Sequence, residues 1–87
     1  MLRIQRAQEG DAVTLLISGD LVGEYVVELE RAVAVEGSGR RVILDLSELA
    51  HVTRAGVKLL AHLQTSGAHL VGCPEYVQQW VAREQLP

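Results

Sequence analysis

The sequence predicts a single α/β domain over residues 1–87, with a mixed four-stranded sheet and helices in the element order β-β-α-β-α-β-α. Short apolar or alternating runs mark the strands, and stretches with apolar residues at helical spacing lie between them. The chain length leaves room for one hydrophobic core. Because strand–helix–strand units favour parallel pairing, we expect an opening hairpin to supply the antiparallel edge of the sheet.

The opening hairpin is predicted from alternation and turn chemistry. Residues 2–6 alternate apolar and polar side chains, as a half-buried strand does. Residues 9–11 combine glycine with acidic residues, which is typical of a turn, and residues 12–18 form a second, β-rich run. We expect residues 19–20, a Gly-Asp pair, to end the second strand.

The first helix is predicted from about Glu24 to Val35, and the Gly-rich residues 36–39 should stop it. Acidic residues early in this segment suit the positive end of the helix dipole. The apolar positions that recur at helical spacing are Val26, Leu29, Ala32 and Val33.

The central strand is predicted at residues 41–46, which are apolar on both faces in the middle. This pattern indicates a strand with parallel neighbours and helices over one face, with Leu44 in the core. Residues 47–52 are expected to form a loop, and a second helix should run from about Ala55 to Gln64. The side chains that this helix should bury against the sheet are Leu59, Leu60 and Leu63.

The C-terminal part is predicted to hold a short strand at residues 69–71 and a third helix. Pro74 is well placed as the first residue of that helix, where its missing N–H costs nothing. The core face predicted for the third helix consists of Tyr76, Val77, Trp80 and Val81.

Composition and charge argue against several partners. The net charge is −3 and the eight basic residues are spread along the chain, so no nucleic-acid partner is expected. No apolar run approaches the roughly 20 residues of a membrane span, and the first residues lack the pattern of a signal peptide. A single cysteine, Cys73, suits a reducing compartment. We therefore expect a cytoplasmic protein without direct membrane insertion.

The residues that carry chemistry in other proteins do not form a recognisable catalytic or metal pattern here. His51, His62 and His69 share no i, i+4 spacing with one another or with the cysteine, and zinc needs several convergent ligands. The Gly-rich residues 36–39 lack the lysine of a phosphate-binding loop. We expect no metal, no cofactor and no enzymatic activity.

Four short motifs occur in a characteristic order. They are Ser-Gly-Asp-Leu at 18–21, Leu-Asp-Leu-Ser at 44–47, Thr-Arg-Ala-Gly-Val at 53–57 and Gly-Ala-His-Leu-Val at 67–71. In order and spacing they resemble the STAS family, the sulfate transporter and anti-sigma-factor antagonist domains. The resemblance covers nearly the whole chain and implies the same element order that the patterns predict.

The chain departs from the family at one position that matters for function. In the antagonists that the motif resembles, a partner kinase phosphorylates the serine immediately before the glycine, which adds about −1.5 to −2 charge at a helix N-terminus. That position is Ala55 here, and Thr53 and Arg54 replace the family's acidic residue and serine. The resemblance therefore implies a domain that is not phosphorylated at this site.

A partner-binding surface is predicted around the start of the second helix. Thr53 is a plausible N-cap, whereas Arg54 places a cation where the helix dipole opposes it. Arg54 is either a contact for a partner's carboxylate or a solvated arginine; as a contact it should be exposed and free of an internal salt bridge. The candidate partner-binding residues are His51, Thr53, Arg54, Ala55, Gly56 and Lys58.

The function that the resemblance implies is a regulatory protein-interaction domain of a bacterial-type complex. The expected partner is a protein, either a regulator or a kinase-like anti-sigma factor, and weak self-association is a further expectation. The alternative is a peripheral STAS subunit of a membrane ABC transporter of the lipid type, with transporter subunits as partners.

Overall fold

The computed structural model describes residues 1–85 of the chain. The elements follow one another as the sequence predicted, β-β-α-β-α-β-α. Their bounds are β1 Leu2–Glu9, β2 Ala12–Leu21, α1 Glu24–Glu36, β3 Arg41–Val52, α2 Arg54–Thr65, β4 His69–Val71 and α3 Glu75–Glu84.

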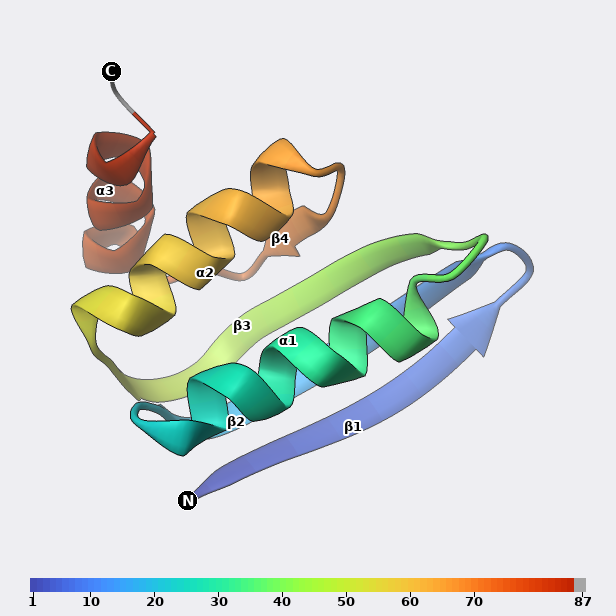
Figure 1. Cartoon of the computed structure of the whole chain (residues 1–87), viewed down its shortest axis with the longest axis horizontal. Coiled ribbons are helices and arrows are strands. Elements are labelled where there is room, and N and C mark those ends of the chain that lie inside the picture. Colours follow the sequence, from blue (N-terminus) through green and yellow to red (C-terminus); the bar gives the residue numbers. More distant parts are fainter. Residues whose placement is uncertain (86–87) are drawn as a thin grey trace.

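The four strands form one mixed sheet in the order β1-β2-β3-β4. β1 pairs with β2 antiparallel, and β2–β3 and β3–β4 pair in parallel. β3 is thus a central strand with parallel neighbours on both sides, and the hairpin supplies an antiparallel edge, as expected. Figure 1 shows β1 lying along one outer edge of the molecule, with the N-terminus at its start.

Two helices, α1 and α2, lie side by side over one face of this sheet (Figure 1). The strand side chains that point toward them are fully buried, among them Val13, Leu15 and Leu44. On the opposite face, Thr14, Leu16 and Ile43 are only half-buried. The core therefore lies between the helices and one face of the sheet, which is the arrangement that the sequence predicted for the central strand.

The third helix packs beside α2 and extends the helical layer (Figure 1). Val77 and Val81 are buried, as predicted, and Trp80 is half-buried. The prediction for Tyr76 was wrong, because its side chain is 54% exposed. Pro74 is the N-cap rather than the first helical residue, and its extended backbone, with ψ of 145°, explains the difference.

The largest correction concerns residues 47–52, which form the second half of β3 and not a loop. β2 also continues through Gly19 and Asp20 to Leu21, and the two strands stay paired up to the Leu21–Val52 rung. Register shifts between Leu16 and Ser18 and between Gly19 and Asp20 interrupt the alternation of side chains. These irregularities hid the extension, because sequence patterns identify strands by regular alternation.

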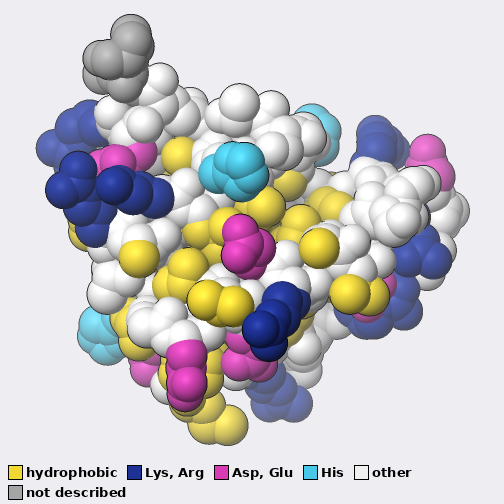
Figure 2. Space-filling model, viewed as in Figure 1, with side chains coloured by type: hydrophobic (Ala, Val, Ile, Leu, Met, Phe, Trp, Pro, Cys, Tyr) yellow, Lys and Arg dark blue, Asp and Glu magenta, His cyan; other side chains and the backbone are white. Residues whose placement is uncertain are grey.

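Within residues 1–85, every helix falls short of the length and apolar character that a membrane span requires. Lys and Arg side chains gather at two ends of the face in Figure 2, one near α3 and one near the hairpin. Between them, apolar side chains show between α1 and α2.

Candidate partner-binding surface

The corner where β3 passes into α2 holds most of the predicted site residues. Thr53 has an extended backbone and is the N-cap of α2, as expected, with its Oγ1 accepting a hydrogen bond from the Gly56 N–H at 3.5 Å. The Thr53 N–H donates to the Leu21 carbonyl at 3.3 Å, which ties the cap to the end of β2. The start of α2 is therefore fixed by the sheet beneath it.

Gly56 is buried in this corner and its identity has a steric reason. A Cβ at this position would lie 2.7 Å from the Leu21 carbonyl oxygen and 2.8 Å from a methyl carbon of Val52. Both distances are shorter than real Cβ contacts. Gly56 lets the first turn of α2 approach the ends of β2 and β3 closely, so its role in this structure is packing.

His51 lies on the opposite side of the same corner, next to Asp20. Its Nδ1 is 2.8 Å from Asp20 Oδ1, and the N-terminal ammonium group of Met1 is 2.9 Å from Asp20 Oδ2. Hydrogen bonds from that ammonium group and from His51 hold the pKa of the Asp20 carboxyl below its usual value. Asp20 is consequently a carboxylate at neutral pH, and the exposed His51 ring is oriented by it.

Arg54 is exposed, with 70% of its side chain accessible, but it is not free of an ion pair. Its Nε lies 3.5 Å from Glu84 Oε2 on α3. The expectation of an unpaired Arg54 was wrong, because α3 packs against α2 and brings a carboxylate to the start of that helix. An ion pair with one partner so exposed contributes little to stability, about 0–1 kcal/mol.

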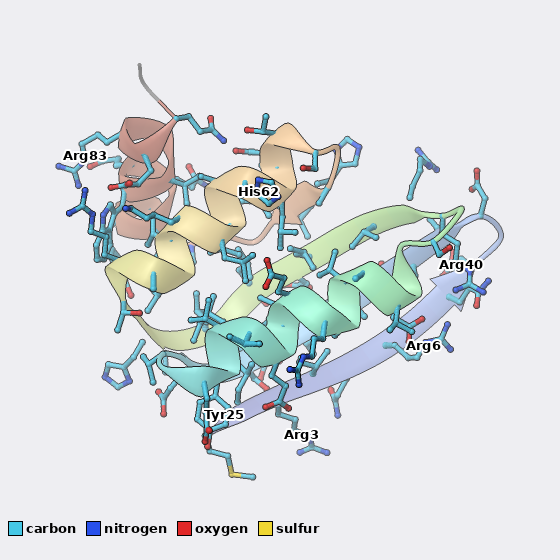
Figure 3. All side chains as sticks on the ribbon, in the orientation of Figure 1. Arg3, Arg6, Tyr25, Arg40, His62 and Arg83 are labelled. Atoms are coloured by element: carbon cyan, nitrogen blue, oxygen red, sulfur yellow. The ribbon has the colours of Figure 1, made fainter. Side chains whose placement is uncertain are left out.

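Three basic side chains follow one another along the outer face of α2. Arg54, Lys58 and His62 are four residues apart and all exposed, so they form a stripe, the α2 basic stripe. Figure 3 shows His62 on the outward side of the helix, and Arg83 of α3 near the other end of the stripe. This surface is positively charged at the end of α2 where the helix dipole is also positive.

A shallow groove of about 510 Å³ runs between the α2 basic stripe and α3. Lys58, His62 and Thr65 line it from α2, and Glu84 and Gln85 line it from the end of α3. The Gln85 amide donates to Gln64 Oε1 at 2.6 Å, which helps to hold the end of α3 against α2. The groove therefore presents the Lys58 ammonium group and the His62 imidazole on one wall and the Glu84 carboxylate on the other.

The structure brings together most of the residues that the sequence singled out. Thr53, Arg54, Ala55 and Lys58 are exposed around the start of α2, whereas Gly56 is buried. His51 lies at the end of β3, where it contacts Asp20 rather than the α2 basic stripe.

Sequence reasoning missed His62, Glu84 and Gln85 as members of this surface. The spacing of four residues from Arg54 to Lys58 to His62 was a usable signal for His62. Nothing in the sequence indicated Glu84 and Gln85, since their position depends on how α3 packs. Among residues 1–85, no group of three or more His, Cys, Asp or Glu side chains is arranged to hold a metal ion.

The chain is similar to a known protein in its structure rather than in its sequence. No protein-family model matches the sequence, and no curated protein matches it significantly. A solved structure of the anti-sigma factor antagonist SpoIIAA in its unphosphorylated form superposes with a TM-score of 0.68, at 15% sequence identity. The match covers 88% of this chain and 79% of that chain. With the element order and the mixed sheet described above, this match identifies the fold of the chain as a STAS-like fold.

Proposed function

We propose that this chain is a regulatory protein-docking domain, and that its partner binds along the α2 basic stripe. The observation that carries the proposal is the row of exposed side chains Arg54, Lys58 and His62, which places two cations and an imidazole at the N-terminal end and along the outer face of α2. Acidic side chains on a partner would complement this row. The domain acts by docking rather than by turnover, in a cytoplasmic regulatory or scaffold complex.

The energetic cost of the stripe supports a binding role. Arg54 opposes the dipole of α2, which costs about 0.3–1 kcal/mol at an exposed site. Lys58 is four residues away and adds like-charge repulsion of about 0.2–0.5 kcal/mol. The first turn of α2 contains no acidic residue to compensate, and the carboxylate that reaches this end of the helix, Glu84 of α3, forms its ion pair with Arg54. A partner's carboxylates would relieve this repulsion, and local rules are broken most often at functional sites.

Ala55 supports a docking surface that phosphorylation does not switch. Its side chain is exposed beside Arg54 and has no hydroxyl, at the position where the STAS motif places the phosphorylated serine. A phosphate there would place negative charge next to Arg54 and Lys58 and neutralise the stripe. With alanine, the positive charge of the surface is permanent, so binding is controlled by the supply of the partner.

Phosphorylation assays test this absence of a switch. After incubation with a STAS-type kinase and ATP, we expect mass spectrometry to find the wild-type protein unmodified, because Ala55 offers no acceptor oxygen. Ala55→Ser is the matched variant and should gain one phosphate at residue 55. A phosphate on Thr53 of the wild type would contradict the proposal, since Thr53 would then provide the switch that Ala55 lacks.

Charge reversal tests the docking surface. A partner recovered from the native host by affinity purification is titrated calorimetrically with the wild type and with Arg54→Glu/Lys58→Glu. Charge-assisted hydrogen bonds contribute about 1.5–3 kcal/mol each, so the double variant should bind at least about tenfold more weakly. Its melting temperature should change little, because exposed charges contribute within about 0.5 kcal/mol to stability.

The matched control is Arg31→Glu/Arg41→Glu, which makes the same change in net charge at exposed positions away from α2. It should bind like the wild type. Equal weakening by both double variants, or unchanged affinity of the α2 variant, would contradict the proposed surface. Recovery of ATPase and permease subunits as specific partners would instead favour the transporter alternative.

A further inference from the structure

The free edge of the sheet is the surface that carries a further inference. β1 forms one edge and pairs with β2 along an unbroken register of eight rungs, from Leu2–Gly19 to Glu9–Ala12. The other edge, β4, has only three residues. A long, regular edge strand presents a row of unpaired backbone groups, which is a template for pairing with another strand.

The turn of the hairpin determines which residues of β1 have their backbone groups free. Gly10 has a φ of 59° and Asp11 has a negative φ, which corresponds to a two-residue type II′ turn. Such a turn is closed by a hydrogen-bonded pair, here Glu9–Ala12. The Asp20 N–H donates to the Met1 carbonyl at 2.9 Å, in agreement with the same alternation at the other end. The backbone N–H and C=O groups of the odd-numbered residues of β1 therefore point toward β2.

The backbone N–H and C=O groups of the even-numbered residues consequently point away from β2, past the free edge of the sheet. These residues are Leu2, Ile4, Arg6 and Gln8. Because β1 is an edge of the sheet, these groups have no strand partner within the described part of the chain. If two copies of β1 pair antiparallel, the residues whose backbone N–H and C=O groups point past the free edge must lie opposite one another, so that these groups can form hydrogen bonds. Two registers with long overlap satisfy this condition: one places Gln5 opposite Gln5, and the other places Arg6 opposite Arg6.

Charge complementarity selects between these registers. With Arg6 opposite Arg6, Arg3 of each copy lies opposite Glu9 of the other, and the two side chains share a face of the sheet. Both side chains are exposed, and neither forms an ion pair within residues 1–85. With Gln5 opposite Gln5, Arg3 lies directly opposite Ala7, and Glu9 is only its more distant diagonal neighbour. Figure 3 shows Arg3 reaching beyond the free edge of β1.

The one like-charge contact in the favoured register is already neutralised within each copy. Arg6 Nε lies 3.0 Å from Glu36 Oε1, and Arg6 also donates to the Gln8 side chain at 3.0 Å. Figure 3 shows Arg6 near the end of α1 and Arg40, whose guanidinium lies 3.8 Å from the same Glu36 carboxylate. Each Arg6 is thus held toward its own helix and away from the twofold axis.

We propose that this chain forms a homodimer through antiparallel pairing of β1 with β1 of a second copy, in the register that places Arg3 opposite Glu9. The two sheets then join into one continuous sheet with a twofold axis at Arg6. α2, which carries the basic stripe, contacts β3 and lies away from the β1 edge of the sheet (Figure 1). The dimer therefore presents two partner-binding surfaces at once. This inference does not depend on the identity of the partner.

Sedimentation equilibrium over a range of protein concentrations tests the dimer and its register. The wild type should show a monomer–dimer equilibrium. The twofold axis repeats the contact between residues 3 and 9, so Arg3→Glu and Glu9→Arg each create two pairs of like charges in the dimer. Each variant should therefore raise the dissociation constant at least about tenfold. The double variant Arg3→Glu/Glu9→Arg restores opposite charges and should dimerise like the wild type. Arg31→Glu on α1, the matched control, should not affect the equilibrium.

Disulfide trapping provides an independent measurement, with Cys73 replaced by serine. In the proposed register Gln5 lies opposite Ala7 in a pair that lacks mutual hydrogen bonds, where Cα atoms are about 4.5 Å apart and a disulfide can form. A mixture of Gln5→Cys and Ala7→Cys proteins should therefore give a disulfide-linked heterodimer.

Three outcomes would overturn the proposal. A wild type that stays monomeric at all concentrations would mean that the charges on β1 protect the edge from pairing. Failure of the double variant to recover dimerisation would contradict the Arg3–Glu9 contact. Cross-linking of Gln5→Cys to itself in preference to Ala7→Cys would indicate the other register. Circular dichroism melts of every variant establish that each one is folded.

Discussion

Replacing Leu44 by alanine is expected to lower the free energy of unfolding by about 2–5 kcal/mol. Leu44 lies in the first half of β3, is 0% exposed, and is paired with Leu15 of β2 and Leu70 of β4. The substitution removes buried apolar atoms and leaves a cavity that the strands on both sides cannot close, since their backbones are held by the sheet. For a domain of this size the melting temperature should fall by at least about 10 °C.

The measurement is urea or thermal unfolding followed by circular dichroism. Val35→Ala is the control: Val35 is 72% exposed at the end of α1, and its truncation should change stability by less than about 0.5 kcal/mol. A Leu44→Ala protein as stable as the Val35→Ala protein would contradict the central, buried position of β3.

Replacing Gly56 by valine is expected to lower the free energy of unfolding by about 3 kcal/mol. Adding single methylene groups to a packed core costs about 1–3 kcal/mol, and a valine side chain is larger than one methylene group. A Cβ alone would meet the Leu21 carbonyl oxygen at 2.7 Å and Leu21 Cγ at 3.1 Å. The Leu21 carbonyl accepts the Thr53 N–H, and Leu21 is paired with Val52, so this backbone has no freedom to move aside. Valine would push the first turn of α2 away from the sheet and disturb the Thr53 cap.

Ala55→Val is the matched control for Gly56→Val, because it introduces the same β-branched side chain one residue earlier at an exposed position. It should cost no more than about 0.5 kcal/mol, the penalty for a β-branched residue in a helix. Urea unfolding compares the two variants. Unfolding midpoints that agree would mean that Gly56 is not held against β2 and β3 as the structure describes.

Much of the fold could be predicted from the sequence because local patterns of apolar residues indicate the type of each element and the face that it buries. The run from Val42 to Leu46, apolar except for Asp45, indicated a central strand. Helical spacing placed Leu59, Leu60 and Leu63 in the core, where the structure buries them. These predictions succeeded because a side chain's face is set by the period of its own element, 2 for a strand and 3.6 for a helix.

The local geometry at the start of α2 was also predictable in part. Thr53 at the end of an extended segment is a sequence signal for an N-cap, and the structure shows that cap. The absence of a hydroxyl at Ala55 is likewise a property of the sequence alone.

Tertiary structure decided the rest, because the contacts involved join residues that are distant in the chain. His51 contacts Asp20 across 31 positions, since the bulged end of β2 pairs with the extended end of β3. Arg54 meets Glu84 because α3 packs along α2, and the same packing leaves Tyr76 in solvent. Periodicity determines which face of an element is apolar, whereas the neighbours that cover that face are set by how the elements pack together.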